Sequence, residues 1–449
     1  MAKNDTQTEG SRLTNNGDAA MNGEKAIGLW SAVAIGIGAM IGAGIFSILG
    51  VGGQIAGNAL YISFIIGGIV ALLATYSYAK LGVRYPSAGG PAEYLVQGFG
   101  DGILSGGFNI LLWISYVFGL ALYSRAFGEY AKTFLPASAP GLWTNIFAIV
   151  VILIFTAINF IGAKTVGRSE KLIVAVKVAI LLIFVSAGIF FIKPELLSPI
   201  LWPRASTIFF GATITYVAYT GFNLITTASE DMDNPQKTLP RALYLSVIIV
   251  TLIYVSVSFT AVGNLPIPAL INARDYALAQ AAQPFLGSVG FKIIAIAALF
   301  STASGINATL YGGANVSYML ARDGELPPMF ERKIWSRGTE GLFITAGFTL
   351  LFANVFDLSG IAMLGSSSIL LIQVAVNLVH LRLYKNTGAS PSILLLTVIA
   401  SLTFFGILVY YEIGHSPAAL YGLIITLILC FIGEWAYRGY SHRTIKTRK

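Results

Sequence analysis

The chain has 449 residues, of which 56% are hydrophobic and only 11% are charged, and its mean hydropathy is +0.76. Soluble proteins carry about a quarter charged residues, so this composition excludes a protein whose surface faces mainly water. Cys430 is the only cysteine, which excludes an intrachain disulfide and a cysteine-based metal site. The net charge of +8 is compatible with a nucleic-acid partner, so the placement of the basic residues along the chain matters.

Long apolar runs predict membrane-spanning helices. In a lipid bilayer every backbone N–H and C=O needs an internal partner, so only helices or a closed barrel can span it. A barrel would need segments of roughly ten residues that alternate in polarity, whereas this chain has unbroken apolar runs at 146–160, 172–192 and 393–411. The sequence therefore predicts an all-α polytopic membrane protein.

Twelve segments are long enough to cross about 30 Å of hydrocarbon. Pro, Gly and charge clusters separate them. Before the first segment, residues 1–26 are polar and predict a disordered cytoplasmic tail without a cleaved signal peptide. The predicted spans are 27–48, 57–83, 93–131, 143–163, 168–192, 206–228, 240–263, 286–320, 340–357, 359–383, 391–411 and 416–437.

Basic residues are distributed unevenly between the two sides of the predicted membrane. With the N-terminus inside, 21 of the 28 Lys and Arg residues fall in cytoplasmic loops and tails, and six fall on the other side. This asymmetry predicts that both termini are cytoplasmic, including a basic tail at 438–449. Because these charges mark the topology, we expect no nucleic-acid partner.

Lys177 is the one basic residue that fits neither side. It lies nine residues past Arg168, or roughly 13 Å deep at helical rise. A charge at this depth costs on the order of 3 kcal/mol or more and usually faces a cavity; the alternative is a side chain that snorkels from the helix end. Carboxylates such as Glu412 and Glu434 fall near span ends. Lys177 is therefore the strongest candidate for a proton carrier.

The first span is rich in glycine, and three interpretations compete for it. Gly36 and Gly38 begin like a dinucleotide-binding fingerprint, but the third glycine is out of register and no strand precedes them. Gly38 and Gly42 also fit a helix packing face. The third interpretation is a helix broken at 42–44, whose open N–H groups would bind an anionic group such as a carboxylate.

The sixth span has a corresponding feature about 180 residues later, because polar residues and Gly221 lie in its middle. Interruptions at matching positions of two halves are the sequence sign of inverted repeats. The predicted repeats are 27–192 and 206–385, and the helix pair at 391–437 follows them.

The two predicted breaks define a candidate substrate site. Tyr216, Tyr219 and Phe222 would form an aromatic wall near the second break, unless these rings serve only packing. The candidate substrate-binding residues are Ile41, Gly42, Ala43, Gly44, Ala218, Tyr219, Gly221 and Phe222.

Four motifs occur in order over nearly the whole chain. They are 38–46 in the first span, 85–91 after the second, 229–242 after the sixth and 321–327 after the eighth. Together they resemble the amino acid–polyamine–organocation (APC) superfamily. The resemblance implies a LeuT-type fold of 12 transmembrane helices, with a 5+5 inverted repeat and broken helices 1 and 6.

Further stretches are similar to proton-coupled members of that superfamily with broad amino acid specificity. In such members a lysine on span 5 occupies the place where relatives bind a sodium ion between spans 1 and 8. Lys177 matches this lysine, and the resemblance implies the Gly38 carbonyl and Ser301 as its partners, with Ser304 one turn away as a substitute. Proton loss would free these spans to rearrange between outward and inward states. We expect a proton as the coupling ion, no sodium and no cofactor.

The expected function is a secondary active transporter that imports amino acids by proton symport. Neutral amino acids are favoured, because no carboxylate is predicted in the middle of a span, where it could pair with a cationic side chain. An exchanger without proton coupling and a non-transporting amino acid sensor are the alternatives. An intramembrane enzyme is not expected, because the spans lack a catalytic set of His, Cys and carboxylates.

Overall fold

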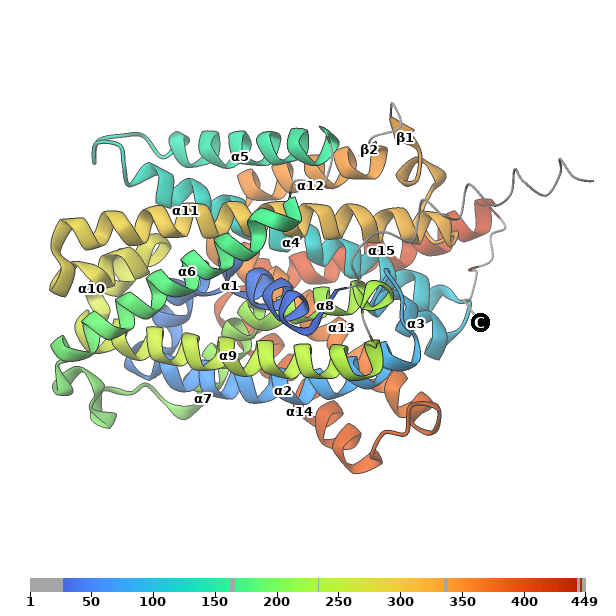
Figure 1. Cartoon of the computed structure of the whole chain (residues 1–449), viewed down its shortest axis with the longest axis horizontal. Coiled ribbons are helices and arrows are strands. Elements are labelled where there is room, and N and C mark those ends of the chain that lie inside the picture. The colour runs from blue at the N-terminus through green and yellow to red at the C-terminus, as the bar shows by residue number, and fades with distance from the viewer. Residues whose placement is uncertain (1–26, 162–165, 233, 335–337, 442–444, 446–449) are drawn as a thin grey trace, which may run out of the picture.

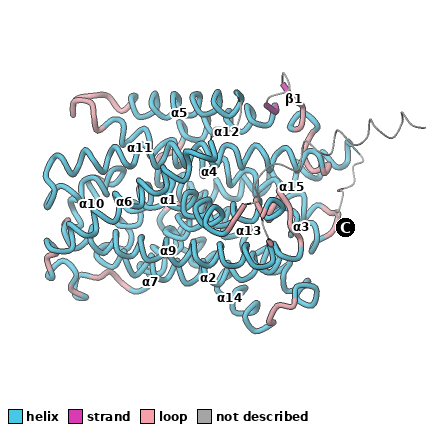
Figure 2. Tube along the Cα trace, in the orientation of Figure 1, coloured by secondary structure: helices cyan, strands magenta, loops and turns pink. Residues whose placement is uncertain are grey.

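The computed structural model describes residues 27–161, 166–232, 234–334, 338–441 and 445, and the predicted tail 1–26 and most of 438–449 lie outside these residues. The side chains of Ala43, Arg274 and 166–171 are likewise outside the description. The described chain is almost entirely helical (Figures 1 and 2). Its strands form one two-residue pair, β1 (Lys333–Ile334) and β2 (Gly338–Thr339).

Each predicted span corresponds to a helix or to a run of shorter helices. The first five correspond to α1 (Leu29–Ala56), α2 (Leu60–Arg84), α3 (Pro91–Phe99) with α4 (Ile103–Lys132), α5 (Leu142–Ile161) and α6 (Val166–Gly188). The next five correspond to α7 (Ala205–Thr215) with η6 (Tyr216–Asn223) and α8 (Leu224–Thr227), α9 (Pro235–Asn264), α11 (Ala277–Arg322), α12 (Glu340–Val355) and α13 (Leu358–Thr387). The last two are α14 (Pro391–His415) and α15 (Pro417–Ser441).

Short helices connect these elements. They are η1 (Gly57–Ala59), η3 (Ile189–Phe191), η4 (Pro194–Leu197), η5 (Pro199–Leu201), η7 (Ser229–Asp231), α10 (Ile267–Asn272), η8 (Arg274–Tyr276) and η9 (Pro328–Phe330).

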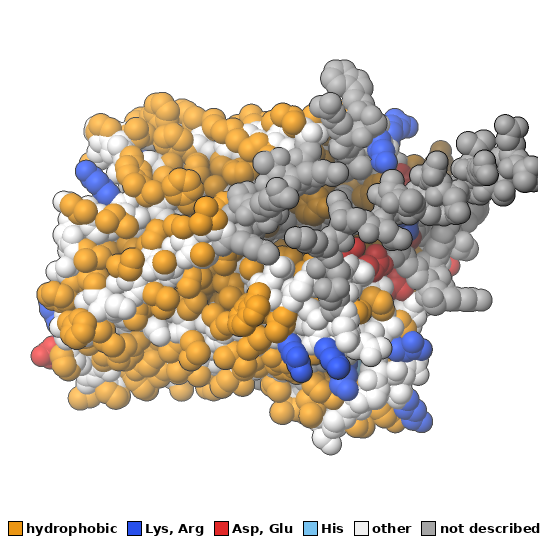
Figure 3. Space-filling model, viewed as in Figure 1, with side chains coloured by type: hydrophobic (Ala, Val, Ile, Leu, Met, Phe, Trp, Pro, Cys, Tyr) orange, Lys and Arg blue, Asp and Glu red, His pale blue; other side chains and the backbone are white. Residues whose placement is uncertain are grey.

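The surface of the helical bundle is largely apolar. Ten helical stretches of the described chain are long and apolar enough to cross a membrane. Shorter apolar stretches are Leu29–Gly42, which is the first half of α1, and Glu340–Val355, which is α12. Figure 3 shows apolar side chains over most of one face, with charged side chains gathered mainly toward one end of the molecule. The prediction of an all-α polytopic membrane protein is confirmed.

The third predicted span, 93–131, divides into α3 and α4. Gly100 ends α3 with a φ of 75°, a left-handed conformation that glycine adopts without steric penalty. Ser105 of α4 bonds across the break, with its Oγ 2.6 Å from the Gly100 carbonyl oxygen. The sequence prediction missed this break because the apolar pattern continues on both sides of it.

The predicted interruption of the first span is wrong, because α1 is a continuous helix from Leu29 to Ala56. Its glycines serve close packing instead. A Cβ on Gly42 would lie 2.9 Å from the Cα of Gly305 on α11, and a Cβ on Gly44 would lie 2.9 Å from the Cβ of Ala218. Each glycine weakens a helix by about 1 kcal/mol relative to alanine, which the packing of α1 against its neighbours offsets.

The interruption of the sixth span is present. α7 ends at Thr215, and the eight residues of η6 form a 3₁₀-helix before the short α8. A 3₁₀ stretch in mid-helix commonly marks a hinge or local strain. Gly221 lets this stretch approach α1 closely, since a Cβ there would lie 2.6 Å from the Met40 amide nitrogen.

If each helix is replaced by its counterpart in the other predicted repeat, the same packing contacts are found. α1 packs against α9 as α2 packs against α7, and α4 packs against α13 as α11 packs against α6. In the same way α5 contacts α11, and α12 contacts α4. Two halves of similar fold would produce this pattern, which supports the predicted repeats at 27–192 and 206–385; their boundaries stay a prediction.

The close packing of α1 against α11 gives a first prediction. Gly42→Ala should destabilise the protein by about 1–3 kcal/mol, because the added Cβ overlaps the backbone of Gly305 and one helix must shift. Gly406→Ala on α14 is the matched control, since a Cβ there meets nothing within 4 Å. Thermal unfolding of the two purified variants in detergent measures the difference, and equal melting temperatures would contradict the packing role of Gly42.

Candidate functional site

Lys177 lies inside the bundle, at the meeting point of three helices. Its side chain is 2% exposed, although it belongs to α6, whose other face is largely open to lipid. The Lys177 amino group donates a hydrogen bond to the Gly38 carbonyl of α1 at 3.1 Å and another to the Ser304 Oγ of α11 at 3.4 Å. These contacts rule out a snorkelling side chain, and they join α1, α6 and α11 through one basic group.

Ser301, the other predicted partner of Lys177, holds a neighbouring part of α1. Its hydroxyl donates to the Ile41 carbonyl at 2.9 Å. Ser304, one turn further along α11, is the serine that accepts from Lys177. Ser301 therefore joins α11 to α1 directly, whereas Ser304, the predicted substitute, bonds to Lys177, which in turn bonds to α1.

Tyr254 of α9 connects α1 to the interrupted sixth span. Its hydroxyl lies 2.5 Å from the Met40 carbonyl oxygen of α1 and 3.1 Å from the Ala218 carbonyl oxygen of η6. A carbonyl oxygen has two lone pairs, so Met40 can accept this bond in addition to a helical one. The middle of α1 is thus held by hydrogen bonds from α6, α9 and α11 while it remains helical.

Two small adjoining cavities lie beside η6. Their volumes are about 20 and about 40 Å³, and they share Gly119 and Tyr123 of α4, Thr220 of η6 and Ile369 of α13. The first is also lined by Gly44, Ile48, Phe118, Leu122, Val217, Ala218, Ile361 and Gly365. The second is also lined by Ala39, Ser115, Tyr116, Gly221, Asn223, Leu224 and Thr309.

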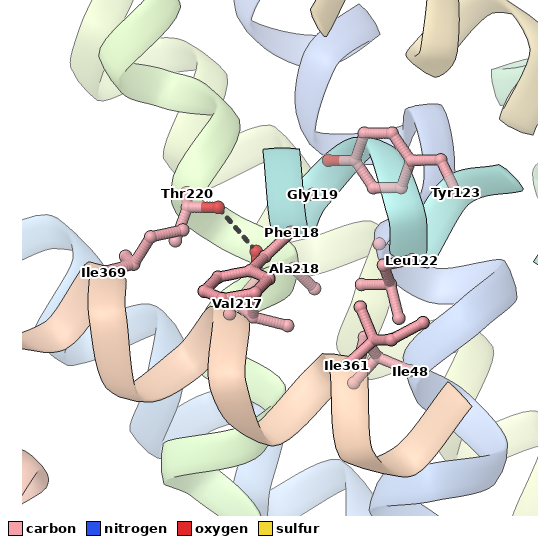
Figure 4. A pocket seen from close by; sticks show the side chains of 12 residues that line it. Ile48, Phe118, Gly119, Leu122, Tyr123, Val217, Ala218, Thr220, Ile361 and Ile369 are labelled. Atoms are coloured by element: carbon pink, nitrogen blue, oxygen red, sulfur yellow. Dashed lines mark hydrogen bonds between the residues drawn. The ribbon is translucent and has the colours of Figure 1, made fainter. Parts of the chain in front are cut away.

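Polar and apolar groups are separated within the first cavity, as Figure 4 shows. The Thr220 hydroxyl donates to the Val217 carbonyl at 2.7 Å, and the Tyr123 hydroxyl lies on the same, upper side of the view. Apolar side chains gather lower in the view, among them Leu122 and Ile361. Neither cavity is lined by a charged side chain of the described residues. The site offers hydroxyl groups on one side and a hydrocarbon wall on the other.

The structure places some of the predicted substrate residues at these cavities and others away from them. Gly44 and Ala218 line the first cavity, and Gly221 lines the second. Tyr219 is directed toward α2, where its hydroxyl donates to the Phe64 carbonyl at 2.7 Å. Phe222 is fully enclosed and packs edge-on against a tyrosine of α2.

The remaining predicted residues contribute packing rather than a cavity wall. Ile41 is completely buried, and Gly42 packs against Gly305. Tyr216 packs edge-on against Phe404 of α14 at 6.2 Å between ring centroids. The side chain of Ala43 lies outside the described part of the chain.

Sequence reasoning missed the cavity walls that α4 and α13 provide. Gly119 and Gly365 lie in the middle of these helices, and a Cβ on Gly119 would meet nothing within 4 Å. A glycine in mid-helix costs about 1 kcal/mol relative to alanine. Such a glycine in a sequence therefore indicates a position where a side chain would obstruct a cavity or a neighbouring helix. The sequence alone does not separate a glycine that opens space, such as Gly119, from one that permits close packing, such as Gly42.

Comparison with known proteins assigns the family. Residues 27–433 match the sequence model of the amino acid permeases. The chain belongs to the amino acid permease family. It is therefore a multi-pass membrane permease, as the four motifs predicted, and its family is one of transporters rather than enzymes.

Several relatives match this permease along nearly their whole length. It is 45% identical over 421 residues to an uncharacterized protein of Methanocaldococcus jannaschii, covering 94% of this chain and 97% of the relative. It is 34% identical over 412 residues to the inner membrane transport protein YbaT of Escherichia coli, covering 92% and 96%. It is 28% identical over 449 residues to the branched-chain amino acid permease BcaP of Lactococcus lactis, covering 92% and 94%.

The double contact of Tyr254 gives a second prediction. Tyr254→Phe removes the hydroxyl that ties α1 to η6 and should lower the stability of the permease by about 0.5–1.5 kcal/mol, the usual net value of a hydrogen bond. Tyr410→Phe on α14 is the control, because Tyr410 is 81% exposed. Thermal unfolding in detergent measures both variants, and a Tyr254→Phe variant as stable as the control would show that the hydrogen bond that this hydroxyl shares between the two carbonyl groups contributes nothing.

Proposed function

We propose that this permease imports amino acids across the cell membrane by proton symport with alternating access. The observation that carries the proposal is the buried Lys177 amino group, which bonds to α1 and α11 at once. A basic residue enclosed in a membrane bundle is a functional group by default, because an unneeded charge there is costly.

The coupling follows from what the proton adds to Lys177. A protonated Lys177 offers a full positive charge to the Gly38 carbonyl and so holds α1 against α6 and α11. When the proton leaves, this charge-assisted bond is lost and α1 is held less firmly. States in which α1 is close to α11 and states in which it has moved away therefore differ in proton affinity, and this difference shifts the equilibrium between them. The ammonium supplies the positive charge, so the proposal needs neither sodium nor a cofactor.

The substrate proposed is a neutral amino acid, with broad specificity. The hydroxyls of Thr220 and Tyr123 and the main chain of η6 suit the polar end of an amino acid, and the apolar wall suits its side chain. A cationic side chain would find no carboxylate at either cavity among the described residues, which makes its burial unfavourable. The names of curated relatives give several different substrates, so this proposal rests on the chemistry of the cavities.

The cavities must widen for substrate to enter. Volumes of about 20 and 40 Å³ hold little more than one or a few water molecules. Their walls come from α1, α4, η6, α8, α11 and α13. η6 lies between two helical segments of the sixth span. A change in the angle between α7 and α8 would move η6 relative to α4 and open this space.

The proposed orientation places both termini on the cytoplasmic side. Basic side chains at one end of the molecule join segments that are distant in sequence. Lys80 bonds to the Gly388 carbonyl, and Arg438 forms a 2.7 Å ion pair with Asp101. These residues belong to the loops that the positive-inside rule assigns to the cytoplasm. This end is called the inner end below, and the opposite end the outer end.

Two alternatives predict different behaviour. An exchanger without proton coupling would swap amino acids across the membrane equally well with or without a pH gradient. A non-transporting sensor would bind amino acids without accumulating them. The contact of Lys177 with α1 and α11, which a proton would strengthen, favours proton symport over both.

The test of this proposal is the uptake of a panel of neutral amino acids into proteoliposomes, with and without an imposed pH gradient. Lys177→Ala should lose gradient-driven accumulation, down to the level without a gradient, while it still binds substrate, because the proton carrier is gone and the cavities are intact. Lys292→Ala is the matched control, since Lys292 is an exposed lysine on α11. Gradient-driven accumulation by Lys177→Ala equal to that of the control would overturn the proton-carrier role.

The location of the substrate site gives a further prediction. Gly119→Leu should weaken amino acid binding at least about tenfold, equivalent to 1.4 kcal/mol, because the leucine side chain would fill the space that both cavities share. Gly433→Leu on α15, where a Cβ also meets nothing within 4 Å, is the control. Titration calorimetry on the two variants decides the matter, and unchanged affinity in Gly119→Leu would place the substrate elsewhere.

A further inference from the structure

Glu412 is a buried carboxyl group that the proposed transport mechanism does not use. The sequence placed it near a span end, but its side chain is 0% exposed inside the bundle. Its Oε1 lies 2.8 Å from the Ser367 Oγ of α13, and its Oε2 is buried without a hydrogen-bond partner. Among the described residues, no Lys, Arg or His forms an ion pair with it.

The hydrogen bonds around Ser367 indicate which form of the carboxyl group fits this site. The Ser367 Oγ lies 2.7 Å from the Met363 carbonyl oxygen as well as 2.8 Å from Glu412. A hydroxyl has one hydrogen to donate. Both contacts are full hydrogen bonds at the same time if Ser367 donates to Met363 and a protonated Glu412 donates to Ser367, whereas beside an ionised Glu412 the serine would have to share its one hydrogen between two acceptors. An ionised Glu412 would leave a buried charge without a counter-ion, which is strongly unfavourable.

The surroundings of Glu412 near the outer end of α14 contain few charged groups. On α14 itself, Tyr411 stacks on the exposed ring of His415. The titratable groups that the packed elements bring toward this end are Tyr61 of α2, Arg204 before α7, Tyr216 of η6, Asp357 before α13 and Tyr421 of α15. Of these, Tyr216 has a buried hydroxyl without a hydrogen-bond partner, and Asp357 accepts from the Gly360 amide.

The helix that Glu412 contacts also forms a wall of the candidate substrate site. Ser366, next to Ser367 on α13, donates to the Ile214 carbonyl at 3.4 Å, two residues before η6 begins. Another face of α13 presents Gly365 and Ile369 to the cavities. A change in the contact between α13 and α14 would therefore reach both η6 and the cavity wall.

We propose that Glu412 is a second proton-binding site, separate from Lys177, which holds α13 against α14 when it is protonated. α14 ends three residues later at His415, about 4.5 Å along the helix, so the path for a proton to the outer solution is short. When the carboxyl group gives its proton to outer water, the resulting carboxylate no longer donates to Ser367 and is buried without a cation. The contact between α13 and α14 then loosens and the cavity wall shifts. Alkaline conditions on the outer side therefore lower transport.

Proton binding at Glu412 is tested independently of transport. The infrared difference spectrum of the purified wild-type chain minus Glu412→Gln at neutral pH should contain a carboxylic acid carbonyl band, which separates Glu412 from other buried carboxyl groups such as Glu434. Glu340→Gln, which alters a carboxylate near Arg332 at the molecular surface, is the control and should retain the band. Identical carboxylic acid bands in the wild-type chain and in Glu412→Gln would overturn the proposal.

The effect on the cavity rests on the proposed substrate site and is measured by amino acid counterflow without a pH gradient. As the pH on both sides is raised, counterflow by the wild-type chain should fall, whereas Glu412→Gln should fall less, because position 412 is then always neutral and only the proposed Lys177 site still responds to pH. Glu412→Met, also uncharged and of similar size, serves if the glutamine variant does not fold. A decline in these variants parallel to that of the wild-type chain would overturn the coupling to the cavity. If the wild-type chain shows no counterflow at all, the proposed transport fails while the infrared result still decides proton binding.

Discussion

The structure depends on one constraint, that a positive charge inside a bilayer needs partners within the protein. Lys177 meets it with the Gly38 carbonyl of α1 and the Ser304 hydroxyl of α11. These partners lie on helices far from Lys177 in sequence, so the contact fixes the packing of three spans at once. In the proposed mechanism the strength of this contact depends on a proton, so the same interaction that positions α1 would make its position sensitive to protonation.

α1, the helix at the centre of this arrangement, packs very closely against its neighbours and is still a regular helix. α1 remains helical throughout, and its glycines bring the backbone of α11 and η6 within contact distance of its own. Its carbonyl groups can accept hydrogen bonds from Lys177, Tyr254 and Ser301 because each oxygen has a second lone pair. Of the two spans predicted to be interrupted, only the sixth is, so the proposed bending within a span belongs to η6, whereas α1 would move as a whole.

Lys177 and Glu412, the two buried groups with a proposed proton-binding role, differ in their surroundings. Lys177 has two hydrogen-bond acceptors, which suit a cation, whereas Glu412 has a single serine and an unpartnered oxygen, which suit a neutral acid. The first group joins helices of the two predicted repeats, and the second joins α13 to α14, which follows the repeats. A membrane interior makes both arrangements sensitive to pH, because there is no water to screen a charge that appears or disappears.

The sequence by itself determined the all-α membrane fold, the positions of the spans, the buried lysine and the second interruption. These follow from local properties, namely apolar length, charge placement and glycine content, which act through the bilayer on each segment separately. Only the tertiary structure decided whether a glycine opens a cavity, as Gly119 does, or permits close packing, as Gly42 does. It also decided that Ser304 accepts from Lys177 and that Glu412, near a span end, is fully enclosed. Each of these depends on which helices face one another, and a helical periodicity common to all spans does not encode that choice.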